Sequence, residues 1–228
     1  MPEWKQYLNR RLTPSQAAAV VVIVAVLGGL GYATYKFIAA QVFEAQVRAA
    51  VPRVCNAVRQ QRAAIATAIE AYKASFGVYP PDHVVSRQPL VVDPVTNTLV
   101  YELVGAAYNS TNKMVSVGRL EAAEAAYVKG FFHIEGLRNC GERDDQVKHF
   151  LPAESLPVKQ LHDDPDVFVL SAAVTYEELD PDVYYSIDRG SWHYVSSAPT
   201  NNPGRFDLWI EVKVGDQKVT IGSWKSAE

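Results

Sequence analysis

The sequence has few cysteines and no excess of basic residues. Its 228 residues include two cysteines, and its 22 Lys and Arg are outnumbered by 25 Asp and Glu, which gives a net charge of −3. Domains that bind nucleic acid usually carry a basic surface. No run of Lys or Arg occurs here outside residues 5–11. The composition therefore argues against a nucleic-acid partner.

The sequence also lacks the motifs of common catalytic sites. It has no GxSxG, P-loop or dinucleotide fingerprint, and Gly28-Gly29-Leu30-Gly31 lies inside an apolar run that phosphate would not reach. The histidines show no HxH or HxxxH spacing, which argues against zinc. We expect a protein that is not an enzyme and has no catalytic or cofactor-binding residues.

Calcium is the one metal for which ligands are partly present. The acidic clusters Asp163-Asp164-Asp166 and Asp180-Asp182 could supply some of the six to eight oxygen ligands that calcium takes. Both clusters contain an Asp-Pro step, however, and Asp is common in turns and at helix caps. We favour turns and predict no metal site.

A long apolar stretch dominates the N-terminal part. No charged residue occurs between Arg11 and Lys36, and about 20 apolar residues in a helix can cross a bilayer. The run is longer than the 7–15 residues of a signal-peptide core, although Ala39-Ala40-Gln41 could serve as a cleavage site. Basic residues precede the stretch, and this indicates a cytoplasmic N-terminus. We predict a cytoplasmic segment at 1–13 and a transmembrane helix at 14–40.

The helix has clear start and stop signals. Thr13 is placed as N-cap, Pro14 stands in the first helical position, and Gln16 could complete a capping box. Gly77 provides a left-handed stop, and Pro80-Pro81 follows. The whole helix would be roughly 90 Å long at about 1.5 Å per residue.

Residues 41–77 continue the helix as an amphipathic segment. Apolar residues recur at spacings of three and four from Val47 to Tyr72, so one face requires a partner. Pro52 is expected to kink or interrupt this segment. The short patch of Gly28, Gly29 and Gly31 either allows close helix packing in the membrane or is a tolerated flexible point.

The rest of the chain changes character. In a variable middle region, 78–165, we predict short helices from Asp93 to Val104 and from Arg119 to Lys129, with loops between them. Residues 166–228 are predicted to form an antiparallel sheet with strands at 167–174, 183–187, 192–195, 206–214 and 218–221. Gly215-Asp216 between two alternating runs predicts a hairpin. The fold class is α+β, with the long helix covering the small C-terminal sheet.

Two further features leave alternatives open. Cys55 and Cys140 are a candidate disulfide if the domain lies outside the cytoplasm, but buried free cysteines are also common. The aromatic residues of the predicted sheet could form a surface for a sugar or peptide. Packing across strands is the better explanation. These aromatic residues are Tyr184, Tyr185, Trp192, Tyr194, Trp209 and Trp224.

Together these residues resemble the pseudopilins of type II secretion systems and, more widely, type IV pilin-like proteins. The resemblance rests on the apolar helix with its amphipathic continuation, on the helix ending 62–82 (RAAIATAIEAYKASFGVYPPD), and on the closing runs Phe206-Asp207-Leu208-Trp209 and Ile221-Gly222-Ser223-Trp224. It covers the helix and the last sheet, but the middle, about 88–166, poorly.

The resemblance implies a pilin-like subunit of a periplasmic pseudopilus that supports protein secretion. It would span the inner membrane once, with its C-terminal domain in the periplasm, and would associate with copies of itself, other pseudopilins, inner-membrane secretion components and lipid. The helix assembly face is expected to comprise Val20, Val24, Leu27, Gly28, Gly31, Val47 and Val51. The helix–sheet core is expected to comprise Val54, Val58, Ile65, Ile69, Tyr72, Phe76, Phe206, Leu208, Trp209, Ile221 and Trp224.

The processing motif departs from the family pattern. Family precursors have a leader ending in Gly, then an aromatic residue, and a Glu four positions later. Here Arg11, Leu12 and Gln16 occupy these positions. The calcium-binding loop of many major pseudopilins is reduced to Asp216. The resemblance therefore implies an unprocessed subunit without that calcium site, and the alternative is an anchored periplasmic binding or adaptor domain that does not polymerise.

Overall fold

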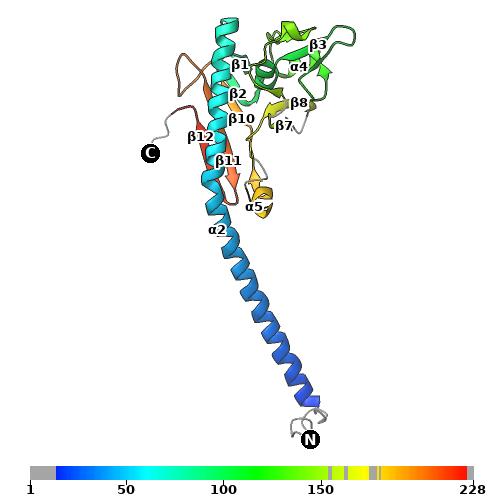
Figure 1. Ribbon diagram of the computed structural model, residues 1–228, viewed down its shortest axis with the longest axis vertical. Helices are drawn as coiled ribbons and strands as arrows, with labels where there is room; N and C mark the ends of the chain where they lie inside the picture. Colours follow the sequence, from blue (N-terminus) through cyan, green and yellow to red (C-terminus); the bar gives the residue numbers. More distant parts are fainter. Residues whose placement is uncertain (1–13, 154–155, 162–163, 175–178, 180, 225–228) are drawn as a thin grey trace. The chain divides into compact units, whose positions relative to one another are not determined.

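A computed structural model describes residues 14–153, 156–161, 164–174, 179 and 181–224 of the chain (Figure 1). These residues belong to two compact units, one ending at Gln46 and one starting at Val47. The boundary between them falls within helix α2 (Pro14–Phe76). The predicted segment 1–13, which includes Arg11, Leu12 and Thr13, lies outside the described residues, as do the side chains of Gln16 and Val20.

Helix α2 has the predicted extent. It runs through Pro52 without an interruption, so the proline does not divide the helix. Gly77 follows with φ +77°, and its N–H donates to the carbonyl of Lys73 at 2.7 Å. This left-handed stop is the one that the glycine predicts, because a residue with a Cβ atom rarely adopts that conformation.

The C-terminal sheet is antiparallel and lies beside the second part of α2 in Figure 1. Its central strand is β11, which pairs on one side with β12 and on the other with β10 and β9. Gly190 allows the bend between β9 and β10, because a Cβ at this position would lie 2.1 Å from the carbonyl oxygen of Glu211. The bounds are β9 (Ile187–Asp188), β10 (Trp192–Val195), β11 (Asp207–Val214) and β12 (Gln217–Gly222).

The predicted hairpin joins β11 to β12. Val214 pairs with Gln217, so Gly215 and Asp216 form a two-residue loop, and Gly215 has φ +57°. A Cβ at Gly215 would lie 3.0 Å from Val47 of α2. The glycine thus serves both the turn and the close approach of the hairpin to the helix.

Helix and sheet bury a common core, as predicted. Residues of β11 alternate, so that Leu208, Ile210, Val212 and Val214 are buried while Trp209 and Lys213 are not. Most of the residues predicted for this core are buried: Val54, Val58, Ile65, Ile69, Tyr72, Phe206, Leu208 and Ile221. Phe76, Trp209 and Trp224 are only half-buried. Trp209 was wrongly placed in the core because, in β11, it points to the face opposite Leu208 and Ile210.

The middle region contains more sheet than predicted. Strands β1 (Asp82–Arg87) and β2 (Leu90–Asn97) form one antiparallel pair, and β7 (Val158–Leu161) and β8 (Asp164–Leu170) form another. A third sheet has the order β5-β4-β3-β6, with β3 and β6 parallel. Its strands are β3 (Ala106–Asn109), β4 (Met114–Ser116), β5 (Ala123–Glu124) and β6 (Cys140–Gly141).

Three elements predicted from the sequence differ from those in the structure. The helix α3 (Leu99–Val104) begins after Asp93-Pro94, which lie in β2, since proline is tolerated where a strand needs no N–H donor. The helix α4 (Ala125–Phe131) is shifted relative to 119–129, and a 3₁₀ turn η1 (Asp144–Gln146) follows later. The strand predicted at 183–187 is largely the helix α5 (Pro181–Tyr185), which Pro181 starts.

The strand predicted at 167–174 also pairs with a different strand from those predicted. It is β8, which ends at Leu170 and pairs with β7 instead of the C-terminal sheet. Directly after β8, Ser171 forms an isolated bridge with Ser191, which precedes β10 of the C-terminal sheet.

Candidate functional site

The first unit presents an apolar helix surface. The large apolar side chains from Val21 to Ile38 are each 54–67% exposed. The helix is long and apolar enough to be a candidate membrane span. Polar groups in this stretch are satisfied locally, since Thr34 Oγ1 donates to the carbonyl of Leu30 at 2.9 Å and Lys36 Nζ lies 5.6 Å from the centre of the Tyr32 ring. This surface needs an apolar environment outside the chain itself.

Part of the predicted assembly face lies on this surface. Val24 and Leu27 are exposed, and a Cβ added at Gly28 or Gly31 would meet nothing within 4 Å. The fold of the chain itself therefore does not require glycine at these two positions.

Val47 does not belong to an exposed assembly face. It is 5% exposed because the hairpin loop at Gly215 packs on it. Val51, one turn further, is half-buried. The prediction for Val47 was wrong because the apolar stripe does not reveal where the sheet begins to cover the helix.

Buried polar contacts fix the second part of α2 to its own domain. Gln61 donates to the carbonyl of Ser171 at 2.9 Å and accepts from the N–H of Ala173 at 2.8 Å. Arg62 donates to the carbonyl of Gly222, at the end of β12. A buried amide with both groups paired stabilises one register of the helix against the strands.

Glu102 of α3 forms the most buried of these contacts. It is 0% exposed, and its carboxylate accepts from the Tyr72 hydroxyl at 2.9 Å and from the N–H groups of Arg138 and Asn139 at 3.0 and 2.9 Å. Burial raises the pKa of Glu102, and the same burial together with Glu102 raises the pKa of Tyr72. The contact joins α2 to the middle region.

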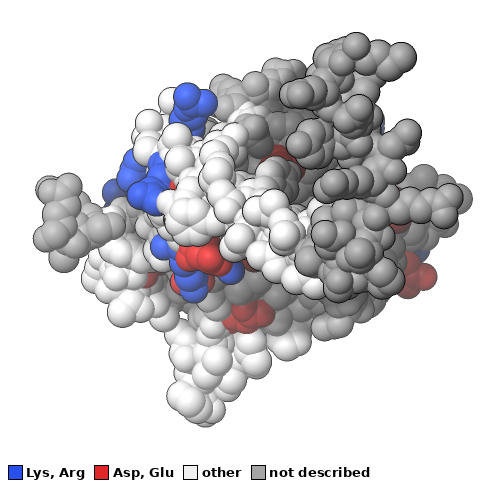
Figure 2. Space-filling view, turned by 90° about the horizontal axis from the view of Figure 1, so that it is seen from below, with Lys and Arg blue, Asp and Glu red and all other residues white. Residues whose placement is uncertain are grey.

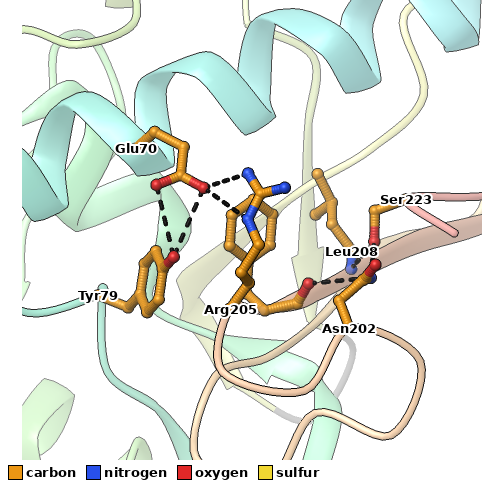
Figure 3. A network of polar contacts seen from close by, with 7 residues as sticks. Glu70, Tyr79, Asn202, Arg205, Leu208 and Ser223 are labelled. Atoms are coloured by element: carbon orange, nitrogen blue, oxygen red, sulfur yellow. Dashed lines mark hydrogen bonds and ion pairs between the residues drawn. The ribbon is translucent and has the colours of Figure 1, made fainter.

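A second network surrounds the end of α2 (Figure 3). Arg205 donates through Nε to Glu70 Oε1 at 3.1 Å, and the Tyr79 hydroxyl lies 3.4 Å from Glu70 Oε2. Asn202 Nδ2 donates to Ser223 Oγ at 2.9 Å, and that oxygen accepts from the N–H of Leu208 at 3.0 Å. The loop before β11 is thus held both to the helix and to the end of β12.

Two buried aspartates order the ends of that loop. Asp82 accepts from the N–H groups of Ser196 and Ser197, both at 2.8 Å. Asp207 accepts from the N–H groups of Thr200, Asn201 and Asn202 at 2.7–2.9 Å. Both carboxylates are therefore occupied by internal donors.

A cleft of about 690 Å³ opens where α2 ends. Its walls come from the end of α2, the segment 78–81, β1, residues 133–138 and the loop before β11. Basic residues line it from four of these segments: Lys73, Arg87, Arg138 and Arg205. This group could not be predicted from the sequence, because its members are dispersed between positions 73 and 205 and form no motif.

Cys55 and Cys140 are free thiols, so the candidate disulfide is not formed in this structure. Burial raises the pKa of the Cys140 thiol, and the nearby Glu102 adds to this effect. Glu102 contacts Tyr72, which follows Cys55 by 17 residues (72 − 55), or roughly 25 Å of helix. The fold therefore places the two cysteines at different levels of α2.

The aromatic residues do not form one surface. Trp192 and Tyr194 are fully buried in the core, and the Trp209 and Trp224 rings lie 5.6 Å apart on the other face of the sheet. Tyr184 and Tyr185 belong to α5 and not to the sheet.

The described residues contain no group of three or more His, Cys, Asp or Glu that could hold a metal ion. Asp163 and Asp180, from the two acidic clusters, lie outside these residues, as do the side chains of Asp164 and Asp166. Asp216 in the last loop is exposed and lies 3.9 Å from Lys213 Nζ.

The face in Figure 2 carries charges of both signs. Basic and acidic side chains lie close together on its described part, with uncharged surface around them.

Comparisons with protein-family models, with curated proteins and with solved structures found no match.

Proposed function

We propose that this chain is a non-enzymatic, membrane-anchored subunit that assembles through its N-terminal helix into a pseudopilus-like periplasmic filament supporting type II secretion. The observation that carries this proposal is the uncharged helix surface from Val21 to Tyr35, whose large apolar side chains are all exposed. Burial of such a surface releases about 25 cal/mol for each Å² of apolar area removed from water. Lipid provides that burial in the membrane, and copies of the same helix would provide it in a filament.

The open glycine positions support helix-to-helix packing. A Cβ at Gly28 or Gly31 would meet nothing within 4 Å beyond the adjoining helix backbone, so their small size is available to a neighbouring helix. Small residues allow close approach of helix backbones in lipid. In this proposal the N-terminus is cytoplasmic and the unit from Val47 onward is periplasmic, with the preceding basic residues setting the orientation.

Cysteine crosslinking in membranes tests the proposal. Leu27→Cys would be introduced into a chain whose own thiols are replaced by Cys55→Ala and Cys140→Ser. A filament gives a ladder of species that extends beyond dimers, since each added subunit offers a further contact. Asn112→Cys, an exposed position in the second unit, is the control for random collision. A chain that remains monomeric at Leu27→Cys contradicts the proposal.

The second candidate function is an anchored adaptor that does not polymerise. It is favoured by Gln16, which stands at the position of the family's Glu and cannot supply a carboxylate to a neighbour. The mass of the mature N-terminal peptide shows whether the chain is processed. A start at Leu12 indicates processing after Arg11, whereas an intact start at residue 1 or 2 indicates an unprocessed chain.

A further inference from the structure

The lining of the cleft at the end of α2 carries four basic residues, Lys73, Arg87, Arg138 and Arg205, against the two carboxylates Asp82 and Glu135. Arg205 is paired with Glu70, and the Asp82 carboxylate accepts from the Ser196 and Ser197 N–H groups. No carboxylate in the described part of the chain lies within ion-pair distance of Lys73 or Arg87. Lys73 Nζ instead lies 4.1 Å from the centre of the Tyr79 ring. The cleft therefore favours an anionic ligand.

The shape and floor of the cleft favour a peptide over a small anion. A volume of about 690 Å³ greatly exceeds that of one carboxylate or phosphate group. Tyr79, Pro80, Pro81 and Pro199 line it. Proline and tyrosine lose little conformational entropy when a ligand binds, and such surfaces commonly accept extended chains.

The chain itself contains a segment with the complementary charge. Four carboxylates occur in the six residues Glu177 to Asp182, and no Lys or Arg occurs between Lys159 and Arg189. Of this segment the structure describes Leu179, Pro181 and Asp182, with Pro181 starting α5.

The cleft and helix α5, which contains the last two residues of the acidic segment, lie at different levels of α2. The strand β9, which directly follows α5, pairs with Lys213 and Val214, and the adjoining Gly215 packs on Val47. The cleft is lined by Lys73, which follows Val47 by 26 residues (73 − 47), or roughly 40 Å of helix. Within the second unit, Figure 1 also shows α5 and β1 toward opposite ends. The described end of the acidic segment, at Pro181 and Asp182, therefore lies far from the cleft of its own copy.

We propose that the acidic segment Glu177–Asp182 of one copy binds in the basic cleft of the next copy. Such a contact uses two different surfaces, so it leaves one of each free at the ends and can repeat without closing. The inference rests on the proposed function, because it gives the filament a second contact between the domains outside the membrane.

Peptide binding tests the cleft directly. A fluorescent peptide of residues 174–183 would be titrated against the full chain in detergent at low and high salt. We expect saturable binding that weakens as salt rises. Binding should weaken about tenfold or more in a Lys73→Glu/Arg87→Glu chain, because charge reversal places like charges together. The matched control is Arg119→Glu/Lys159→Glu, which reverses two exposed charges outside the cleft and should change binding less than about twofold.

A peptide of residues 160–167, which carries three carboxylates, is the second control. Equal binding of both peptides, or unchanged binding to the Lys73→Glu/Arg87→Glu chain, overturns the inference. Thermal unfolding monitored by circular dichroism confirms that each variant is folded. If Lys73→Glu impairs folding, Arg87→Glu alone gives the same test.

Mixed-copy crosslinking tests the contact between copies. Leu179→Cys in one tagged chain and Val84→Cys in another, both without the native cysteines, should give a heterodimer that neither variant gives alone. Lys73→Glu/Arg87→Glu in every copy should prevent formation of the heterodimer. Adding Glu177→Lys/Glu178→Lys to every copy should restore the heterodimer, because both charges are then reversed. No heterodimer, together with an intact Leu27→Cys ladder, overturns this inference and leaves the proposed function standing. Loss of the ladder in the otherwise unchanged chain counts against the proposed function itself.

Discussion

The two parts of helix α2 have the same secondary structure but opposite relations to their surroundings. From Val21 to Ile38 the large apolar side chains are more than half exposed, whereas Val58, Ile65, Ile69 and Tyr72 are 0% exposed. The first part is apolar all round, and the second is apolar on one stripe. An all-round apolar helix needs lipid or other helices, while a striped one needs a single covering layer. The change from one pattern to the other falls near the boundary between the two units, which lies between Gln46 and Val47.

The largest effect expected from this comparison comes from the same deletion made in each part. Ile65→Ala should lower the free energy of unfolding of the second unit by about 2–5 kcal/mol, because it leaves a cavity in a closed core. Ile23→Ala should change it by less than about 0.5 kcal/mol, since that side chain belongs to the first unit and is 56% exposed. Urea unfolding in detergent, followed by tryptophan fluorescence, measures both. Similar losses would contradict the division.

A buried glutamine in the second part of α2 and an exposed one in the first part should also differ in their contribution to stability. Gln61→Leu should destabilise the second unit by about 2–3 kcal/mol, because the Ser171 carbonyl and the Ala173 N–H both lose their partner. Gln41→Leu, at an exposed position of the first part, should have almost no effect. The same unfolding experiment applies, and a stabilising Gln61→Leu would show that these groups find other partners.

The response to pH should also belong to the second unit. No carboxylate or histidine occurs between Val21 and Phe43. Burial lowers the pKa of His83, and the neighbouring His133 adds to this, with Asp93 and Asp82 acting in the opposite direction. Because the folded state then binds the proton more weakly than the unfolded chain, this contribution to stability is present above about pH 6.5 and is lost as the pH falls below it.

His83→Phe should reduce this loss of stability at acidic pH. The ring nitrogens of His83 have no hydrogen-bond partner, so the substitution sacrifices no such bond. Unfolding curves between pH 5 and pH 8 measure the effect. Part of the acid response should remain, because burial also lowers the pKa of His193. An unchanged response would exclude His83 as its source.

The smallest effect is expected at the exposed ion pair of Figure 3. Glu70→Gln removes the charge that Arg205 contacts, and exposed pairs of this kind contribute about 0–1 kcal/mol. The loss should shrink further in 0.5 M salt. Glu44, in the first unit, is the matched position, and Glu44→Gln should leave the stability of the second unit unchanged. A loss of several kcal/mol at Glu70→Gln would mean that the network orders the whole loop before β11.

The elements that could be predicted from the sequence are those with strong local signals. Pro14 and Gly77 determine the ends of α2, and Gly215-Asp216 determines the last hairpin. The segment 183–187 was misread as a strand because a short apolar run fits either structure, and only Pro181 argues for a helix start. The strands of the middle region are short, and their pairing is decided by contacts distant in sequence.

The candidate sites also differ in whether they depend on neighbouring residues or on contacts distant in the sequence. The exposed apolar surface could be predicted, since it depends on consecutive residues. The cleft could not, because Lys73, Arg87, Arg138 and Arg205 are brought together only by the fold. Glu102 was missed for a related reason, as a single acid in an apolar run gives no sign that three donors converge on it.

The close approach of Gly215 to Val47 has a consequence for how this kind of chain can change over time. The first covered residue of α2 is set by the tip of one hairpin, so lengthening β11 and β12 by two residues each, about 7 Å, would cover roughly a further turn of helix. Shortening them would leave Val47 bare. A change in hairpin length, with no substitution in the helix, would therefore alter how much of the helix is left for lipid or for other chains.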